Sequence, residues 1–123
     1  MVIKMEIEME IKLKQFVIIP RKPRMSVGKI ASQTAHATFM ALEKENKELI
    51  EKWKDSGMCV IVLKCKDAVQ LLGIAKYFEQ WNIPHHLYID EGITEVEMGT
   101  PTALATGILR EDKHWMLSQL KRL

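Results

Sequence analysis

Residues 25–40, Met-Ser-Val-Gly-Lys-Ile-Ala-Ser-Gln-Thr-Ala-His-Ala-Thr-Phe-Met, predict the helix around which the fold is organised. Ser26 can accept hydrogen bonds from the free N–H groups of a first helical turn. Alanine, the strongest helix former, recurs at positions 31, 35, 37 and 41. Gly28 would let a neighbouring segment approach the first turn closely.

One face of this helix carries polar chemistry. At about 100° per residue, Lys29, Gln33 and His36 point the same way. An ammonium, an amide and an imidazole on one face are typical of a functional site. His36 on its own is more often a hydrogen-bonded structural histidine, so spacing alone leaves both readings open.

The rest of the chain alternates strand-like and helical segments. Short apolar runs predict four strands, at residues 16–19, 59–63, 85–89 and 102–108. Helical patterns lie between and after them, at residues 26–42, 49–57, 67–78 and 111–120. This alternation predicts an α/β fold: a single three-layer α-β-α domain with a four-stranded mixed, mostly parallel sheet.

Residues 1–14 stand apart from this pattern. Apolar and charged side chains alternate almost strictly from residue 3 to residue 13, which is typical of a half-buried strand. We expect an amphipathic N-terminal extension strand over residues 1–14 and a domain over residues 15–123. The extension could pair with a sheet edge of its own subunit or of a second copy.

Charge is distributed unevenly. The 123 residues are 47% apolar, enough for one core, and the formal net charge is only +2. Residues 11–42, however, contain no acidic residue and six basic ones: Lys12, Lys14, Arg21, Lys22, Arg24 and Lys29. Such a stretch suits contacts with phosphates, although a solvated basic loop would look the same.

Several site classes find no support in the residues. Cys59 and Cys65 lie too far apart on one strand to form a disulfide with each other, which predicts reduced, buried thiols. His85 and His86 are adjacent on a strand and point to opposite faces, so no metal site is expected. No membrane span or secretory leader is recognisable, and a cytoplasmic location is expected.

Two separate motifs resemble those of a known family. The stretch Met-Ser-Val-Gly-Lys-Ile-Ala-Ser-Gln-Thr-Ala-His-Ala (residues 25–37) resembles the helix signature of the type 2 peptidyl-tRNA hydrolases of archaea and eukaryotes. The stretch Asp-Glu-Gly-Ile-Thr-Glu-Val-Glu-Met-Gly-Thr-Pro-Thr (residues 90–102) resembles their second signature. The two motifs agree in spacing and order, and the similarity extends over about residues 15–123.

The resemblance implies a homodimer that hydrolyses, without a cofactor or metal, the ester joining a peptide to the 3′ ribose of tRNA. The implied catalytic residues are Lys29, His36, Asp90, Thr94 and Thr102. The expected substrate-binding residues are Gln33, Arg21, Lys22, Arg24 and Thr100. Ester hydrolysis needs a base and donors to the oxyanion, and either Asp90 or His36 could take the proton.

Two positions depart from the family pattern. Glu91 stands where a small residue is usual, so an extra carboxylate beside Asp90 would raise the pKa of Asp90 or discourage the binding of phosphate. Lys22-Pro23 replaces the usual Asp-Leu and adds positive charge to the first loop. These changes leave open a catalytically silent tRNA-binding or adaptor module on the same scaffold, and a hydrolase of other acyl esters.

Overall fold

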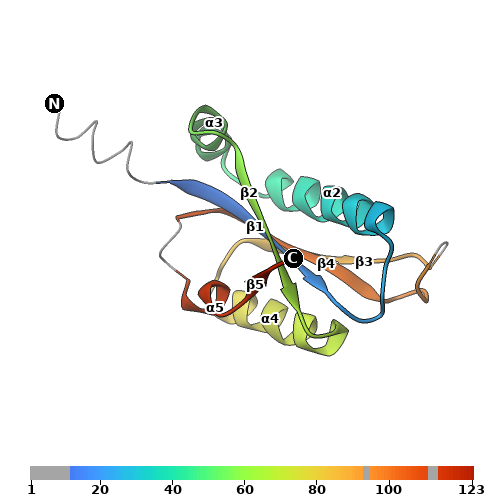
Figure 1. Cartoon of the computed structure of the whole chain (residues 1–123). Coiled ribbons are helices and arrows are strands. Elements are labelled where there is room, and N and C mark those ends of the chain that lie inside the picture. The colour runs from blue at the N-terminus through green and yellow to red at the C-terminus, as the bar shows by residue number, and fades with distance from the viewer. Residues whose placement is uncertain (1–11, 93–94, 111–113) are drawn as a thin grey trace, which may run out of the picture.

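The computed structural model describes residues 12–92, 95–110 and 114–123 (Figure 1). The expected extension over residues 1–14 therefore lies almost wholly outside the described residues. In chain order the elements are β1 (Leu13–Pro20), α2 (Val27–Glu43), α3 (Lys47–Asp55), β2 (Cys59–Cys65), α4 (Ala68–Gln80), β3 (His85–Ile89), β4 (Pro101–Arg110), α5 (Trp115–Ser118) and β5 (Lys121–Arg122).

The described strands form one five-stranded sheet in the order β3-β4-β1-β2-β5. Only the pairing of β1 with β2 is parallel; β4 runs antiparallel to both β1 and β3, and β5 runs antiparallel to β2. The expectation of four strands in a mostly parallel sheet is therefore wrong. The described residues of the connection between β3 and β4 contain no crossover helix, and β4 returns beside β3 in the opposite direction.

The C-terminal segment also differs from expectation. The helix predicted over residues 111–120 is limited to α5, and residues 111–113 are not described. The chain then adds β5 at the sheet edge, where Lys64 faces Lys121 across the pairing with β2. A two-residue basic strand has no apolar run, so its pairing depends on tertiary contacts that periodicity cannot reveal.

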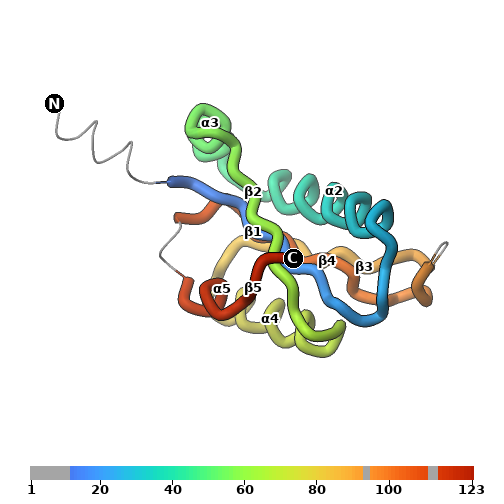
Figure 2. Tube along the Cα trace, in the orientation of Figure 1, coloured from blue at the N-terminus to red at the C-terminus, as the bar shows by residue number. Residues whose placement is uncertain are grey.

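The three-layer arrangement is confirmed: α2 covers one face of the sheet, and α4 and α5 cover the other (Figures 1 and 2). Alternate residues of the central strand β1 enter the two cores. Val17 and Ile19 pack under α2 with Ala37, whereas Phe16 and Ile18 pack under α4. Among the described residues, none of the helices has the length and apolarity needed to cross a bilayer.

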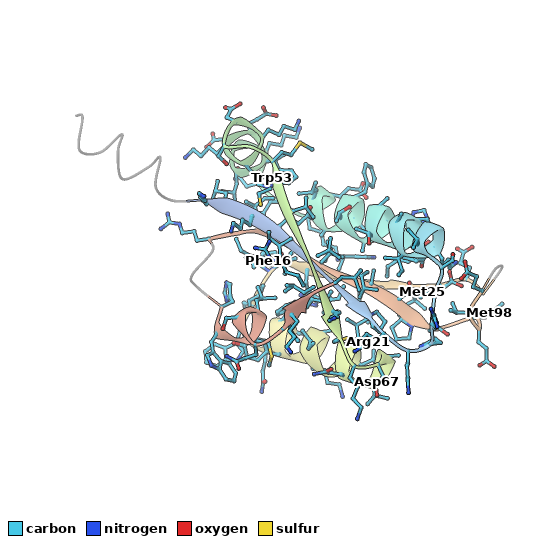
Figure 3. All side chains as sticks on the ribbon, in the orientation of Figure 1. Phe16, Arg21, Met25, Trp53, Asp67 and Met98 are labelled. Atoms are coloured by element: carbon cyan, nitrogen blue, oxygen red, sulfur yellow. The ribbon has the colours of Figure 1, made fainter. Side chains whose placement is uncertain are left out.

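Three connections, β1–α2, β2–α4 and β3–β4, meet at one end of the sheet. Strands β1, β2 and β3 run in the same direction, so their carboxyl ends meet there, together with the start of β4. Figure 3 shows Arg21, Met25, Asp67 and Met98 at this end and Trp53 at the other. Ligands of open α/β sheets commonly bind at this edge.

At the opposite end, β4 passes close to the segment that follows α2. Gly107 donates its N–H to the carbonyl of Pro84 at 2.8 Å, and the next N–H, of Ile108, donates to Glu45 Oε2 at 2.9 Å. A methyl group on Gly107 would collide with that carboxylate oxygen and with Pro84. Gly28 differs, because a Cβ there would meet nothing within 4 Å; the expectation of a close approach at Gly28 is wrong.

Candidate active site

A buried ion pair joins the two motifs. Ser26 is the N-cap of α2, as expected, and its hydroxyl accepts from the N–H of Lys29 at 3.2 Å. The Lys29 ammonium donates to Asp90 Oδ1 at 2.6 Å, and the two side chains are only 9% and 5% exposed. The N–H of Gly92 donates to the other carboxylate oxygen at 2.6 Å.

This environment keeps Asp90 ionised. The hydrogen bond from Lys29, joined by the N–H of Gly92, holds the pKa of Asp90 below its ordinary value although burial opposes the shift. The expectation that Glu91 raises the pKa of Asp90 is wrong in direction, because Glu91 is exposed and the ammonium dominates.

A second buried contact links α2 to the start of β4. The Thr102 hydroxyl donates to Gln33 Oε1 at 2.5 Å, and the two residues are 1% and 3% exposed. The amide nitrogen of Gln33 lies 3.4 Å from the Ser32 hydroxyl. Both members of this pair belong to the predicted site, and each fixes the orientation of the other.

His36 completes the polar face of α2. Its ring stacks on that of Tyr88 in β3, with centroids 4.7 Å apart and planes 16° from parallel. A positive charge on His36 helps to lower the pKa of Asp90, so the two side chains share one electrostatic environment. The prediction that Lys29, Gln33 and His36 point the same way is confirmed, since all three meet β3, β4 or the residue that follows β3.

Thr94 and Thr100 are the two remaining threonines of the predicted site. Thr94 lies outside the described residues. The Thr100 hydroxyl donates to the carbonyl of Glu97 at 2.6 Å, and the Thr100 carbonyl accepts from the N–H of Asp90 at 2.9 Å. Thr100 thus shapes the turn that holds Asp90, and its contact with substrate stays a prediction.

Sequence reasoning missed Glu95, which fastens the β3–β4 connection to α2. Its carboxylate accepts from the N–H of Ser26 at 2.7 Å and from the Ser26 hydroxyl at 2.5 Å. The hydrogen bond from the Ser26 hydroxyl contributes most to holding the pKa of Glu95 below its ordinary value. Sixty-nine residues separate the partners, so no local pattern could reveal the contact.

The basic residues gather in a different place. An open groove of about 920 Å³ lies at the carboxyl ends of β1 and β2. Within residues 12–92, 95–110 and 114–123, its cationic lining residues are six, Arg21, Lys22, Arg24, Lys64, Lys66 and Lys121, and no acidic side chain lines it. Only the first three were predicted. Lys12 and Lys14, although part of the basic stretch, lie at the opposite end of β1.

This groove, called the basic groove below, does not include the Lys29–Asp90 pair. Ile30, in the first turn of α2, lines the groove, whereas its neighbour Lys29 points to Asp90. Cys59 and Cys65 are free thiols as predicted; Cys65, which lines the groove, is buried, and burial raises its pKa to about 11, whereas Cys59 is only half-buried. Within the described segments, no three His, Cys, Asp or Glu side chains are placed to hold a metal ion together.

Comparison with known proteins agrees with the two motifs. Residues 13–123 match the family model described as "Peptidyl-tRNA hydrolase PTH2". A peptidyl-tRNA hydrolase of Methanopyrus kandleri is 37% identical over 102 residues, covering 81% of this chain and 88% of that protein. Those of Haloquadratum walsbyi and Thermococcus onnurineus are 37% and 33% identical, covering 77% and 82% of this chain and 85% and 88% of theirs.

Proposed function

This chain belongs to the peptidyl-tRNA hydrolase PTH2 family, and we propose that it hydrolyses the ester between a peptide and the 3′ ribose of tRNA. The products are free tRNA and free peptide. The observation that carries the proposal is the buried contact of Lys29 with Asp90, since it holds an ammonium against an ionised carboxylate that also lies within electrostatic reach of His36.

For this reaction the protein must take a proton from water, stabilise an oxyanion and return a proton to the ribose oxygen. A water oxygen adds to the ester carbonyl carbon while a base takes the water proton; the carbonyl oxygen becomes an oxyanion; then the bond to the ribose oxygen breaks and that oxygen takes a proton. Lys29 has further N–H donors besides the one given to Asp90, so it can stabilise the oxyanion.

The choice between the two candidate bases follows from the pKa of Asp90. A carboxylate whose pKa is lowered binds a proton weakly, so Asp90 acts by holding Lys29 and accepting a hydrogen bond from the water. We assign the water proton to His36, because a ring nitrogen of a neutral imidazole can accept a proton and later return it to the ribose oxygen. The amide of Gln33 and the hydroxyls of Thr94 and Thr102 orient the water and the ribose.

Arg21, Lys22 and Arg24 bind the substrate through its phosphates. All three are exposed and line the basic groove, which supports this role. Contacts of this kind position an RNA without reading its sequence, so we expect binding of many tRNAs that weakens steeply with salt.

The test follows release of free tRNA from an N-acetylated aminoacyl-tRNA by the wild type and by Lys29→Ala, His36→Ala and Asp90→Asn. Lys76→Ala is the matched control, because Lys76 is exposed on α4, which covers the opposite face of the sheet. We expect each site variant to lose at least about a hundredfold in rate, the usual worth of a positioned acid–base or oxyanion group, and the control to match the wild type.

Each alternative predicts a different result. A wild type that binds tRNA and releases nothing would be a catalytically silent RNA-binding module. Release that is equally fast in all variants would remove these residues from the site. Equal turnover of simple acyl esters and of the tRNA substrate would indicate a general esterase.

We also propose a homodimer and a cytoplasmic location. Peptidyl-tRNA arises during translation, which supports the second. The homodimer is proposed from the resemblance of the two motifs. Light scattering coupled to size-exclusion chromatography tests it by measuring the mass of the protein in solution.

A further inference from the structure

We propose that the basic groove binds the phosphodiester backbone of the acceptor stem of tRNA, and that Lys64, Lys66 and Lys121 contact it together with the cations that follow β1. The identity of the anion rests on the proposed function. The inference adds a second set of binding residues, from β2, from the residue that follows β2, and from β5, which neither sequence motif contains.

The charge of the groove carries the first step. Among the residues that the structure describes, six cationic side chains line one concave surface, and no acidic side chain lines it. Asp67, next to Lys66, turns its carboxylate to the N–H of Gln70 at 2.8 Å as the N-cap of α4. A concave surface lined by one sign of charge concentrates polyanions.

The pairing of β5 with β2 carries the second step. Lys64 and Lys121 are directly opposite each other in this antiparallel pair, and both line the groove. Like charges at such positions are destabilising. Lysine at a sheet edge also protects against aggregation, but that task needs no second lysine opposite it. A phosphate held between the two ammonium groups would convert the repulsion into binding.

The position of the groove beside the site carries the third step. Figure 2 traces β5 alongside β2, with the carboxyl end of β2 and the β1–α2 connection at the same end of the sheet. The first turn of α2 separates the groove from the ion pair, since Ile30 faces the groove and Lys29 faces Asp90. A helix with its side chains is about 10–12 Å wide. An acceptor stem in the groove can therefore pass its unpaired 3′ end over this turn to Asp90.

The binding test compares two triple variants. Lys64→Gln, Lys66→Gln and Lys121→Gln are combined in the groove variant; Lys47→Gln, Lys52→Gln and Lys76→Gln, all exposed on α3 or α4, form a control with the same loss of charge. Dissociation constants for deacylated tRNA are measured by fluorescence anisotropy over a series of salt concentrations. Three lost phosphate contacts should reduce the slope of log Kd against log salt by about two to three.

The kinetic test separates binding of the stem from catalysis. The groove variant should lose about tenfold in kcat/KM with N-acetyl-aminoacyl-tRNA, as expected for three exposed ion pairs, and the loss should lie in KM. With the same acyl group on a CCA trinucleotide, which has no stem, it should match the wild type. A Lys→Arg triple variant keeps the charges and should restore binding.

The results distinguish the two proposals. An unchanged salt slope in the groove variant, or equal weakening in the control, would overturn the groove as the binding surface. So would equal loss with the trinucleotide substrate while the arginine variant remains active. If the wild type binds tRNA with the expected slope but hydrolyses neither substrate, the proposed function fails and the groove inference stands.

Discussion

The strongest test of the site is a double-mutant cycle on Lys29 and Asp90. The two charges are 2.6 Å apart and almost fully buried, so removing one leaves the other without its partner in a poorly solvated place. Breaking such a pair typically costs about 3–5 kcal/mol, whereas replacing both members costs much less. We expect Asp90→Asn and Lys29→Met each to cost about 3 kcal/mol of unfolding free energy, and the double variant to cost less than their sum by at least about 2 kcal/mol.

Urea unfolding followed by circular dichroism at pH 7 measures the four free energies of the cycle. The pH dependence gives a second check. The pKa of Asp90 is lowered in the folded protein, so the carboxylate contributes stability above its unfolded pKa of about 3.9, and this contribution is lost as the pH falls through the folded value. The coupling free energy between Lys29 and Asp90 should therefore be constant from about pH 5 to pH 8 and disappear only in stronger acid. Additive single-variant costs, within about 0.5 kcal/mol, would refute the buried pair.

Three further changes have expected outcomes. Gly107→Ala should lower the free energy of unfolding by about 1–3 kcal/mol because the methyl group overlaps the Glu45 carboxylate; thermal unfolding measures this, and an unchanged Tm would contradict the close packing. Gly28→Ala should raise the free energy of unfolding by about 0.5–1 kcal/mol, since the position is helical and a Cβ there would meet no atom within 4 Å. A loss of stability in the same experiment would contradict this open environment. Glu95→Ala should slow the hydrolytic release of tRNA more than Glu95→Gln, because glutamine keeps an acceptor for the N–H of Ser26. Equal rates in the wild type and both variants would show that the contact of Glu95 with Ser26 does not contribute to catalysis.

The polar face of α2 could be predicted because its information is local. Helical spacing alone places Lys29, Gln33 and His36 on one face, and the structure confirms that direction. The partners of these residues were recognised only by resemblance, since Asp90 and Thr102 lie 61 and 69 residues farther along the chain. Each of the four predicted strand segments also falls within an observed strand, because each contains a short apolar run.

The direction of β4 and the existence of β5 could not be predicted in the same way. Strand direction depends on whether a connection crosses the sheet, and the loop after β3 carries no helical period that would decide it. β5 consists of Lys121 and Arg122, whose side chains indicate solvent exposure and nothing about pairing. Only three of the six cations of the basic groove, Arg21, Lys22 and Arg24, were predicted. Lys64, Lys66 and Lys121 are distant from them in sequence and come next to them only when the sheet forms.

The central place of β1 has a consequence for synthesis of the protein. Gln15 contacts Thr106, 91 residues later, and β1 lies between β2 and β4 in the finished sheet. During translation β1 leaves the ribosome well before β4, so until then one edge of an apolar strand has no neighbour. Contacts this distant in sequence slow folding. We therefore expect the nascent chain to remain without its native sheet, and to be a substrate for chaperones, until β4 has emerged.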